Sequence, residues 1–228
     1  MDSHFWSTID AAIAAKSLLK HPFYQAWSAG QLTREDLQTY AQQYYFLEKN
    51  FPRFLSRIHS NCEDQSVRQH ILQNLNDEEQ GSENHAELWL RFAEGLGTTR
   101  EAVRGAQALP ETDQCVETFQ NLSSNSEYAM GLAALYSYES QIPPVAKTKI
   151  DGLQKWYGIN DERTIKFFKV HQEADVWHSA AEKEMISSAP ATTEQITESV
   201  RAATEALWKF LDGVYRVTCG PRLGAMAC

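Results

Sequence analysis

Apolar residues recur every three or four positions along nearly the whole chain, and this helical periodicity constrains the fold more than any other feature. In residues 2–19, for example, Phe5 and Ile13 fall on one helix face. No run of alternating Val, Ile or Thr is long enough to form a strand. The pattern predicts an all-α fold, with one helical domain over residues 1–217 and a C-terminal tail over 218–228.

Prolines, glycines and capping residues divide this pattern into successive helices. Thr33 followed by Asp36 is an N-cap signature, and Pro52 is expected to kink the helix that begins there. Gly81 lies within a long periodic stretch, where a glycine costs about 1 kcal/mol relative to alanine. We interpret it as a point at which something bulky approaches the helix. The expected helices cover about 2–19, 21–30, 33–60, 63–96, 99–107, 110–122, 127–141, 145–157, 161–187 and 193–217.

Composition excludes several classes of function. The chain has a net charge of −9 and no Lys/Arg-rich run, whereas binding to nucleic-acid phosphates requires clustered positive charge. No apolar stretch approaches the length of a membrane span, and the first residues lack the features of a signal peptide. Four scattered cysteines without a Cys-x-x-Cys pair are typical of a reduced compartment. We therefore expect a cytoplasmic protein that binds neither nucleic acid nor membranes.

The helix expected at 161–187 carries a possible set of metal ligands. His171, Asp175 and His178 have the spacing His-x3-Asp-x2-His, and positions i, i+4 and i+7 share one helix face. Two imidazoles and a carboxylate are good ligands for iron, manganese or zinc. The same spacing also fits a solvated face, so the pattern predicts a metal site only if other helices supply ligands.

Two other expected helices offer such ligands. Glu78 and His85 are seven residues apart, about 700° of helical turn, which predicts that they share a face of the 63–96 helix. Glu139 is a lone carboxylate in a helix rich in Leu, Ala and Tyr, where burial without a partner would be costly. The combined set of three carboxylates and three imidazoles is similar to that of di-iron carboxylate bundles, although the ferritin-type Glu-x-x-His pair is absent.

Taken in chain order, the six residues resemble the ligand signature of the heme-oxygenase-like di-metal oxidases. They are Glu78, His85, Glu139, His171, Asp175 and His178. The fold expected from this resemblance is a heme-oxygenase-like helical bundle, as in thiaminase-like proteins and pyrroloquinoline-quinone synthase. Within the family, the sequence is most similar to the chlamydial protein associating with death domains and its bacterial relatives. The similar segments are His21-Pro22-Phe23-Tyr24, Tyr44-Tyr45, Asn84-His85, Tyr136-Ser137-Tyr138-Glu139-Ser140 and Lys147-Thr148-Lys149.

The resemblance implies synthesis of p-aminobenzoate for folate by a protein that consumes itself. A tyrosine of the chain would supply the ring and a lysine the amino nitrogen, so each chain would react once. By position, the sacrificed residue would be Tyr24 and the donor Lys149, with Tyr40 and Tyr138 as nearby redox-active tyrosines. The implied cofactor is a dinuclear Fe or mixed Mn/Fe site, with O2 and an external reductant as co-substrates. Its ligands would be Glu78, His85, Glu139, His171, Asp175 and His178.

Other functions stay open at this point. A conventional di-metal oxygenase of the same fold would act on an external amine, amino acid or fatty acid and leave its tyrosines intact. A partner-binding module would leave six inward ligands unexplained, and a metal-free enzyme of this fold would not need them. Tyrosines at helical spacing also serve as core aromatics. A homodimer is expected, while the metal identity and the reductant are not fixed by the sequence.

Overall fold

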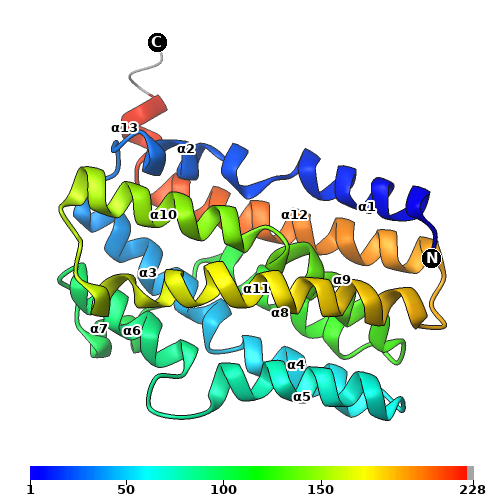
Figure 1. Ribbon diagram of the computed structural model, residues 1–228. Coiled ribbons are helices and arrows are strands. Elements are labelled where there is room, and N and C mark those ends of the chain that lie inside the picture. Colours follow the sequence, from blue (N-terminus) through cyan, green and yellow to red (C-terminus); the bar gives the residue numbers. More distant parts are fainter. Residues whose placement is uncertain (225–228) are drawn as a thin grey trace.

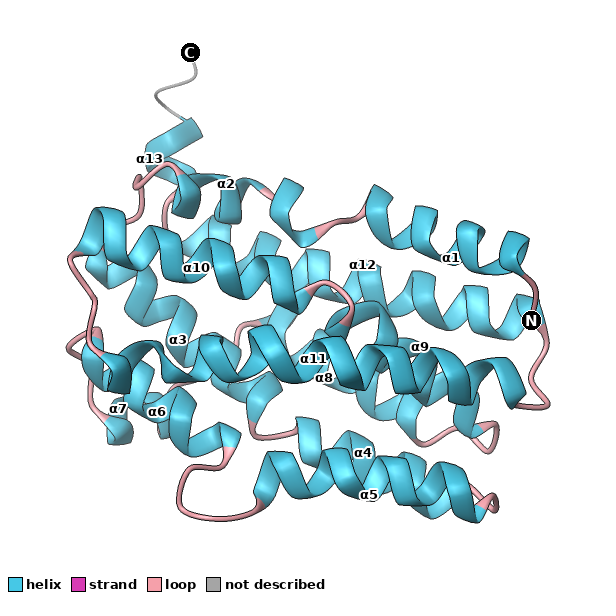
Figure 2. Cartoon of the chain, viewed as in Figure 1, coloured by secondary structure: helices cyan, strands magenta, loops and turns pink. Residues whose placement is uncertain are grey.

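The computed structural model describes residues 1–224, and every regular element in that range is a helix (Figure 2). The predicted all-α fold is therefore confirmed. The two longest helices, α11 (Glu162–Ser188) and α12 (Thr193–Val217), extend along the bundle with shorter helices around them (Figure 1). Among the described helices, none has the length and apolar character needed to cross a membrane.

Shorter helices make up the rest of the bundle. Several begin at a residue whose side chain accepts a backbone N–H, such as Thr33, Asp64 and Asn84. In chain order they are α1 (Ser3–Ala15), the 3-10 turn η1 (Leu18–Lys20), α2 (Pro22–Ser28), α3 (Arg34–Glu48), α4 (Phe51–Asn61), α5 (Gln65–Glu79), α6 (His85–Gly95), α7 (Arg100–Arg104), α8 (Pro110–Ser123), α9 (Tyr128–Glu139), α10 (Ile142–Tyr157) and, after α12, α13 (Gly220–Gly224).

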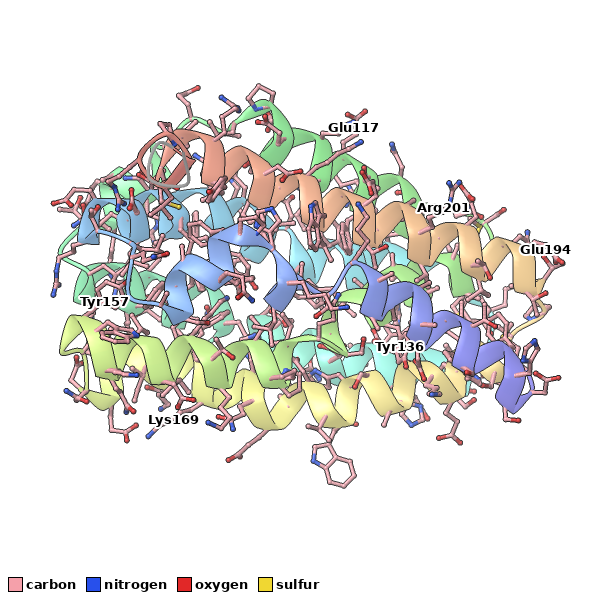
Figure 3. All side chains as sticks on the ribbon, turned by 90° about the horizontal axis from the view of Figure 1, so that it is seen from above. Glu117, Tyr136, Tyr157, Lys169, Glu194 and Arg201 are labelled. Carbon is pink, nitrogen blue, oxygen red and sulfur yellow. The ribbon has the colours of Figure 1, made fainter. Side chains whose placement is uncertain are left out.

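The core lies where α9 is enclosed by its neighbours. Helix α12 packs against α8 and α9, while α11 packs against α6, α9 and α10. Because α9 is apolar around nearly its whole circumference, it is buried on all sides. Charged side chains such as Glu117, Lys169 and Arg201 lie at the periphery of the bundle (Figure 3). A carboxylate on the inner side of α9 is therefore surrounded by protein.

The prediction of a single long helix over residues 63–96 is wrong. Helix α5 ends at Glu79 and α6 begins at His85, so a loop separates the two stretches. Gly81 lies in this loop with φ +80°, a left-handed conformation that residues with a side chain rarely adopt. The interpretation of Gly81 as a point of close approach is also wrong, because no atom lies within 4 Å of the place a Cβ would take. The glycine marks the break in the chain.

Prolines start helices here more often than they bend them. The helix expected at 33–60 is divided between α3 and α4, and Pro52 lies in the first turn of α4 instead of at a kink. Helix α10 begins at Ile142, so Pro143 and Pro144 lie in its first turn and do not delay its start to residue 145. A first-turn proline loses no helical hydrogen bond, since its missing N–H would have no partner there.

The segment expected as a tail begins with α13. Arg222 donates from Nη2 to Asp36 Oδ2 at 2.6 Å and from Nη1 to the carbonyl oxygen of Gln31 at 2.8 Å. These bonds fix α13 against the start of α3. Positions 225–228 lie outside the described residues.

Candidate metal centre and buried tyrosine cluster

Three helices end at one buried point. Glu48 is the last residue of α3, Glu139 is the last residue of α9, and Glu78 is the last but one of α5. All three side chains are buried and line one cavity. The C-terminal end of a helix carries a partial negative charge. Three such ends together with three carboxylates therefore create a strong local preference for cations.

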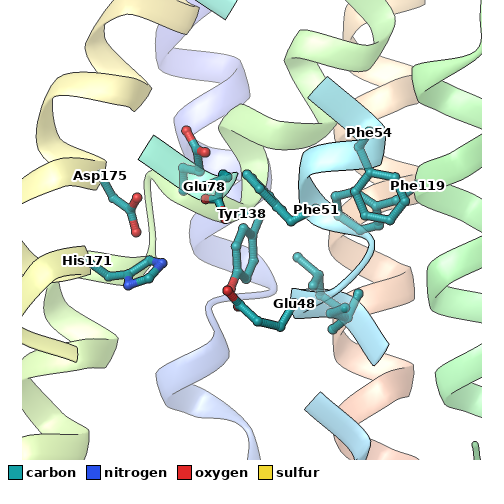
Figure 4. A pocket seen from close by; sticks show the side chains of 11 residues that line it. Glu48, Phe51, Phe54, Glu78, Phe119, Tyr138, His171 and Asp175 are labelled. Atoms are coloured by element: carbon teal, nitrogen blue, oxygen red, sulfur yellow. The ribbon is translucent and has the colours of Figure 1, made fainter. Parts of the chain in front are cut away.

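Helix α11 supplies the facing wall of this cavity. Asp161 caps the helix by accepting the N–H of Thr164, and the predicted His-x3-Asp-x2-His face points inward. Figure 4 shows His171 and Asp175 directed from α11 towards Tyr138. His171 Nδ1 lies 2.8 Å from the Phe167 carbonyl oxygen, which assigns the proton to Nδ1 and leaves Nε2 as the possible ligand atom.

Glu78 and His85 meet although they lie on different helices. Glu78 Oε1 is 2.9 Å from His85 Nδ1 across the α5–α6 loop. The His85 ring centroid is 4.3 Å from that of His171, which joins this pair to the α11 face. The structure thus brings all six sequence-predicted ligands to one site, but the shared helix face expected for Glu78 and His85 does not exist. Asn84 places His85 by capping the start of α6.

The site divides into two groups that could each hold an ion. One group contains Glu139, Asp175 and His178, whose ligand atoms all lie within 4.8 Å of one another. The second contains His85, His171 and Glu48, a residue that the sequence did not single out. Glu48 Oε1, Glu139 Oε2 and Asp175 Oδ2 are buried without a hydrogen-bond partner. Because such oxygens are costly to bury unpaired, this donor set fits iron or manganese ions well.

In the protein without metal ions, the pKa values of the buried carboxylates and imidazoles are shifted from their usual range. Burial raises the pKa of Glu139 to about 8, with nearby Asp175 adding to the shift, and burial raises the pKa of Asp175 to about 6. Burial disfavours the charged imidazoles of His85 and His178, yet the surrounding carboxylates outweigh it and raise the pKa of each to about 9. Divalent cations would replace these protons, since metal ligands bind in their deprotonated forms.

A further carboxylate and an amide lie behind the Glu139 group. Glu182, one turn beyond His178, is buried, and burial together with Glu139 raises its pKa well above the usual range. Asn74 Nδ2 donates to Glu139 Oε1 at 3.2 Å. A cleft of about 400 Å³ reaches Asn74, His178 and Glu182 from the surface of the bundle. The sequence analysis singled out neither residue, although Glu182 continues the spacing of His171, Asp175 and His178 by one more turn, and Asn74 is four residues before Glu78.

Tyr24 is held inward by the start of α2. Pro22 occupies the first turn, and His21 caps it, because His21 Nδ1 accepts the N–H of Phe23 at 3.1 Å. The other ring nitrogen of His21 lies 3.0 Å from Asp212 Oδ1. The side chain of Tyr24 is thereby buried, and its hydroxyl lies 2.9 Å from that of Tyr40. Burial raises the pKa of both phenols above the usual range, so both are protonated.

Lys149 completes this tyrosine cluster. Its side chain is 2% exposed, and Nζ donates to the Tyr40 hydroxyl at 2.7 Å. The same nitrogen lies 5.3 Å from the centroid of the Tyr24 ring. Burial lowers the pKa of Lys149 to about 7, against a partial opposing effect from Glu48. An amine that is about half neutral at pH 7 therefore lies beside two buried phenols.

Tyr44 links the tyrosine cluster to the metal-ligand cavity. The hydroxyls of Tyr44 and Tyr138 are hydrogen-bonded, and Tyr138 lines the cavity. The rings of Tyr40 and Tyr44 are 5.5 Å apart between centroids. Four phenols thus form a continuous series from Tyr24 to the candidate metal centre. Sequence reasoning missed Tyr44 as a site residue, and its only signal was its place in one of the family-like segments.

Comparisons with known proteins agree with this fold and site. Residues 38–210 match the model of a family described as iron-containing redox enzymes. The chain is 44% identical over 227 residues to the 4-aminobenzoate synthase of Nitrosomonas europaea, covering 94% of this chain and 92% of that protein. It is 42% identical over 210 residues to the 4-aminobenzoate synthase of Chlamydia muridarum, covering 92% and 89%.

Among solved structures, the chain is similar to a domain of unknown function with a heme oxygenase-like fold from Shewanella denitrificans. The TM-score is 0.78 at 19% identity, with 95% of this chain and 93% of that chain covered. At this identity the likeness bears on the fold alone, and it confirms the heme-oxygenase-like bundle predicted from the sequence.

Proposed function

The chain belongs to the family of iron-containing redox enzymes, and on that premise we propose that it makes p-aminobenzoate from one of its own tyrosines. Relatives at 44% and 42% identity that are named 4-aminobenzoate synthase support the product. One observation carries the self-sacrificing route: Lys149, Tyr40 and Tyr24 form a buried hydrogen-bonded series. An amine and an oxidisable phenol are the two groups that such a reaction must bring together.

In this proposal Tyr24 supplies the ring of the product. Its Cα–Cβ bond is cleaved, which leaves residue 24 without its side chain. O2 is the oxidant for the conversion of Cβ into the carboxylate carbon, and the phenol oxygen leaves as water when nitrogen replaces it. Lys149 supplies that nitrogen, which requires a neutral amine with a free electron pair. Its Cε–Nζ bond is then broken by oxidation at Cε, with O2 as the oxidant. Because the pKa of Lys149 is about 7, a large fraction of the amine is neutral near neutral pH. Burial keeps water from competing for the oxidised ring.

The oxidising equivalents are proposed to come from the metal-ligand cavity. Its residues would hold a dinuclear Fe or mixed Mn/Fe centre, which supplies O2 activation when bound and requires an external reductant. Tyr138 lines the cavity, and Tyr44 and Tyr40 connect it with Tyr24. An electron can therefore leave Tyr24 in short steps, while each phenolic proton moves within a hydrogen-bonded pair. The proposed ligands are Glu78, His85, Glu139, His171, Asp175 and His178.

Intact mass and released p-aminobenzoate test this function. Purified protein is loaded with Fe(II), with and without Mn(II), and then given reductant and O2. We expect at most one product per chain, loss of a side-chain fragment at residue 24, and no product from Tyr24→Phe. Tyr45→Phe is the matched control, because Tyr45 lies on the same bundle but outside the series of phenols and should leave product formation unchanged.

An intact Tyr24 in metal-loaded protein that consumes O2 would refute self-sacrifice. That result would assign the chain to the oxygenases of this fold that act on an external small molecule.

A further inference from the structure

Glu48 is a buried carboxylate that has no role in the reaction proposed above. It is the last residue of α3 and is 5% exposed. One of its oxygens, Oε1, is buried and has no hydrogen-bond partner. Leaving a carboxylate oxygen unpaired in the interior costs folding free energy. The residue is therefore expected to have a partner that outweighs this cost.

The geometry around Glu48 points to a metal ion as that partner. A carboxylate oxygen of Glu48 and one ring nitrogen each from His85 and His171 all lie within 4.8 Å of one another. The contact between His171 Nδ1 and the Phe167 carbonyl oxygen leaves Nε2 facing the cavity. Glu78 belongs to neither three-residue group, although its Oε1 contacts His85. Without Glu48, this group would contain two imidazoles and no carboxylate.

We infer that Glu48 is a seventh metal ligand beside the six already proposed, binding one ion together with His85 and His171 while Glu139, Asp175 and His178 bind the other. This inference rests on the dinuclear centre of the proposed function. Charge balance supports it, because the six sequence-predicted residues contain three carboxylates, which leave two divalent cations partly uncompensated in a buried site. A fourth carboxylate from Glu48 balances the four positive charges, as expected for buried ions.

Metal stoichiometry separates ligation from mere proximity. Wild-type protein and the Glu48→Gln variant are equilibrated anaerobically with Mn(II) and with Fe(II), and bound metal is counted per folded chain. We expect two ions in the wild type. In the variant, the affinity for one of them should be at least about 100-fold weaker, a larger loss than the loss of metal affinity caused by mutating residues that only contact a ligand. Asp36→Asn is the control: another buried carboxylate on α3, but one that is paired with Arg222 and lies outside both three-residue groups. It should retain two ions.

Two unchanged ions in Glu48→Gln would overturn the inference, and so would an equal loss in both variants, since that would reflect general charge. If Glu48→Gln does not fold, anomalous-difference maps of Mn(II)-loaded wild-type crystals decide the matter. A Glu48 oxygen within bonding distance of an ion supports the assignment, and one outside that distance refutes it. A wild type that binds no metal would instead refute the dinuclear centre of the proposed function.

Discussion

Replacing Lys149 with methionine should remove a pH-dependent part of the protein's stability. Burial lowers the pKa of Lys149 from 10.5 to about 7 in the folded protein. Between these two values the unfolded chain binds a proton that the folded chain does not. The free energy of unfolding of the wild type therefore rises with pH across this window, and the lysine weakens the fold most at pH 7 and below.

The size of the effect follows from linkage. A full proton difference changes the free energy of unfolding by about 1.4 kcal/mol per pH unit. Because Lys149 is half protonated near pH 7, the gain from pH 7 to pH 9 is about 2 kcal/mol relative to Lys149→Met. Methionine has a similar length and no titrating group. The difference between the two proteins at each pH therefore isolates the amine.

Urea denaturation at pH 7, 8 and 9 in the presence of a chelator measures this difference without a contribution from bound ions. Lys147→Met is the control, because Lys147 lies on the same helix but is exposed and paired with Asp151. Its stability should run parallel to that of the wild type. Equal pH dependence in the wild type and Lys149→Met would refute the reasoning, since the buried amine would then be charged and unable to attack a ring carbon.

Three further substitutions test other parts of the structure. Tyr40→Phe removes the hydrogen-bond partner of both Lys149 and Tyr24, so calorimetry should show a loss of about 2–4 kcal/mol; an unchanged melting temperature would contradict those bonds. Gly81→Ala forces a side chain into left-handed backbone and should cost about 1–2 kcal/mol in urea denaturation, whereas no loss would argue against the α5–α6 turn. Tyr44→Phe should lower the p-aminobenzoate released per chain without changing bound metal, and full yield would exclude Tyr44 as a link.

Local sequence signals predicted the helices well because capping and periodicity act over a few residues. Helix α12 runs from Thr193 to Val217 as expected, and α11, capped by Asp161, begins within one residue of the start expected at 161. The error at the α5–α6 loop shows the limit of this reasoning. Between Leu75 and Ala86 the chain has no apolar residue. A polar helix face and a polar loop with Gly81 at positive φ therefore look alike in the sequence.

Residues of the candidate site were predictable only where several shared one helix or one family motif. His171, Asp175 and His178 share a face of α11, so spacing alone brings them together. Glu48 contributes through the place where α3 ends, which depends on the packing of the whole bundle. Glu78 and His85 meet for a tertiary reason as well, so their predicted proximity holds while the predicted cause does not.

The convergence of helix ends also has a consequence for the order of folding. The candidate ligands range from Glu48 to His178 and come from α3, α5, α6, α9 and α11. Contacts between such distant segments form only after large loops have closed, and their entropic cost places them late in folding. A metal ion would thus bind the completed bundle far more strongly than any partly folded chain. Metal loading is then expected to slow unfolding while leaving the folding rate nearly unchanged.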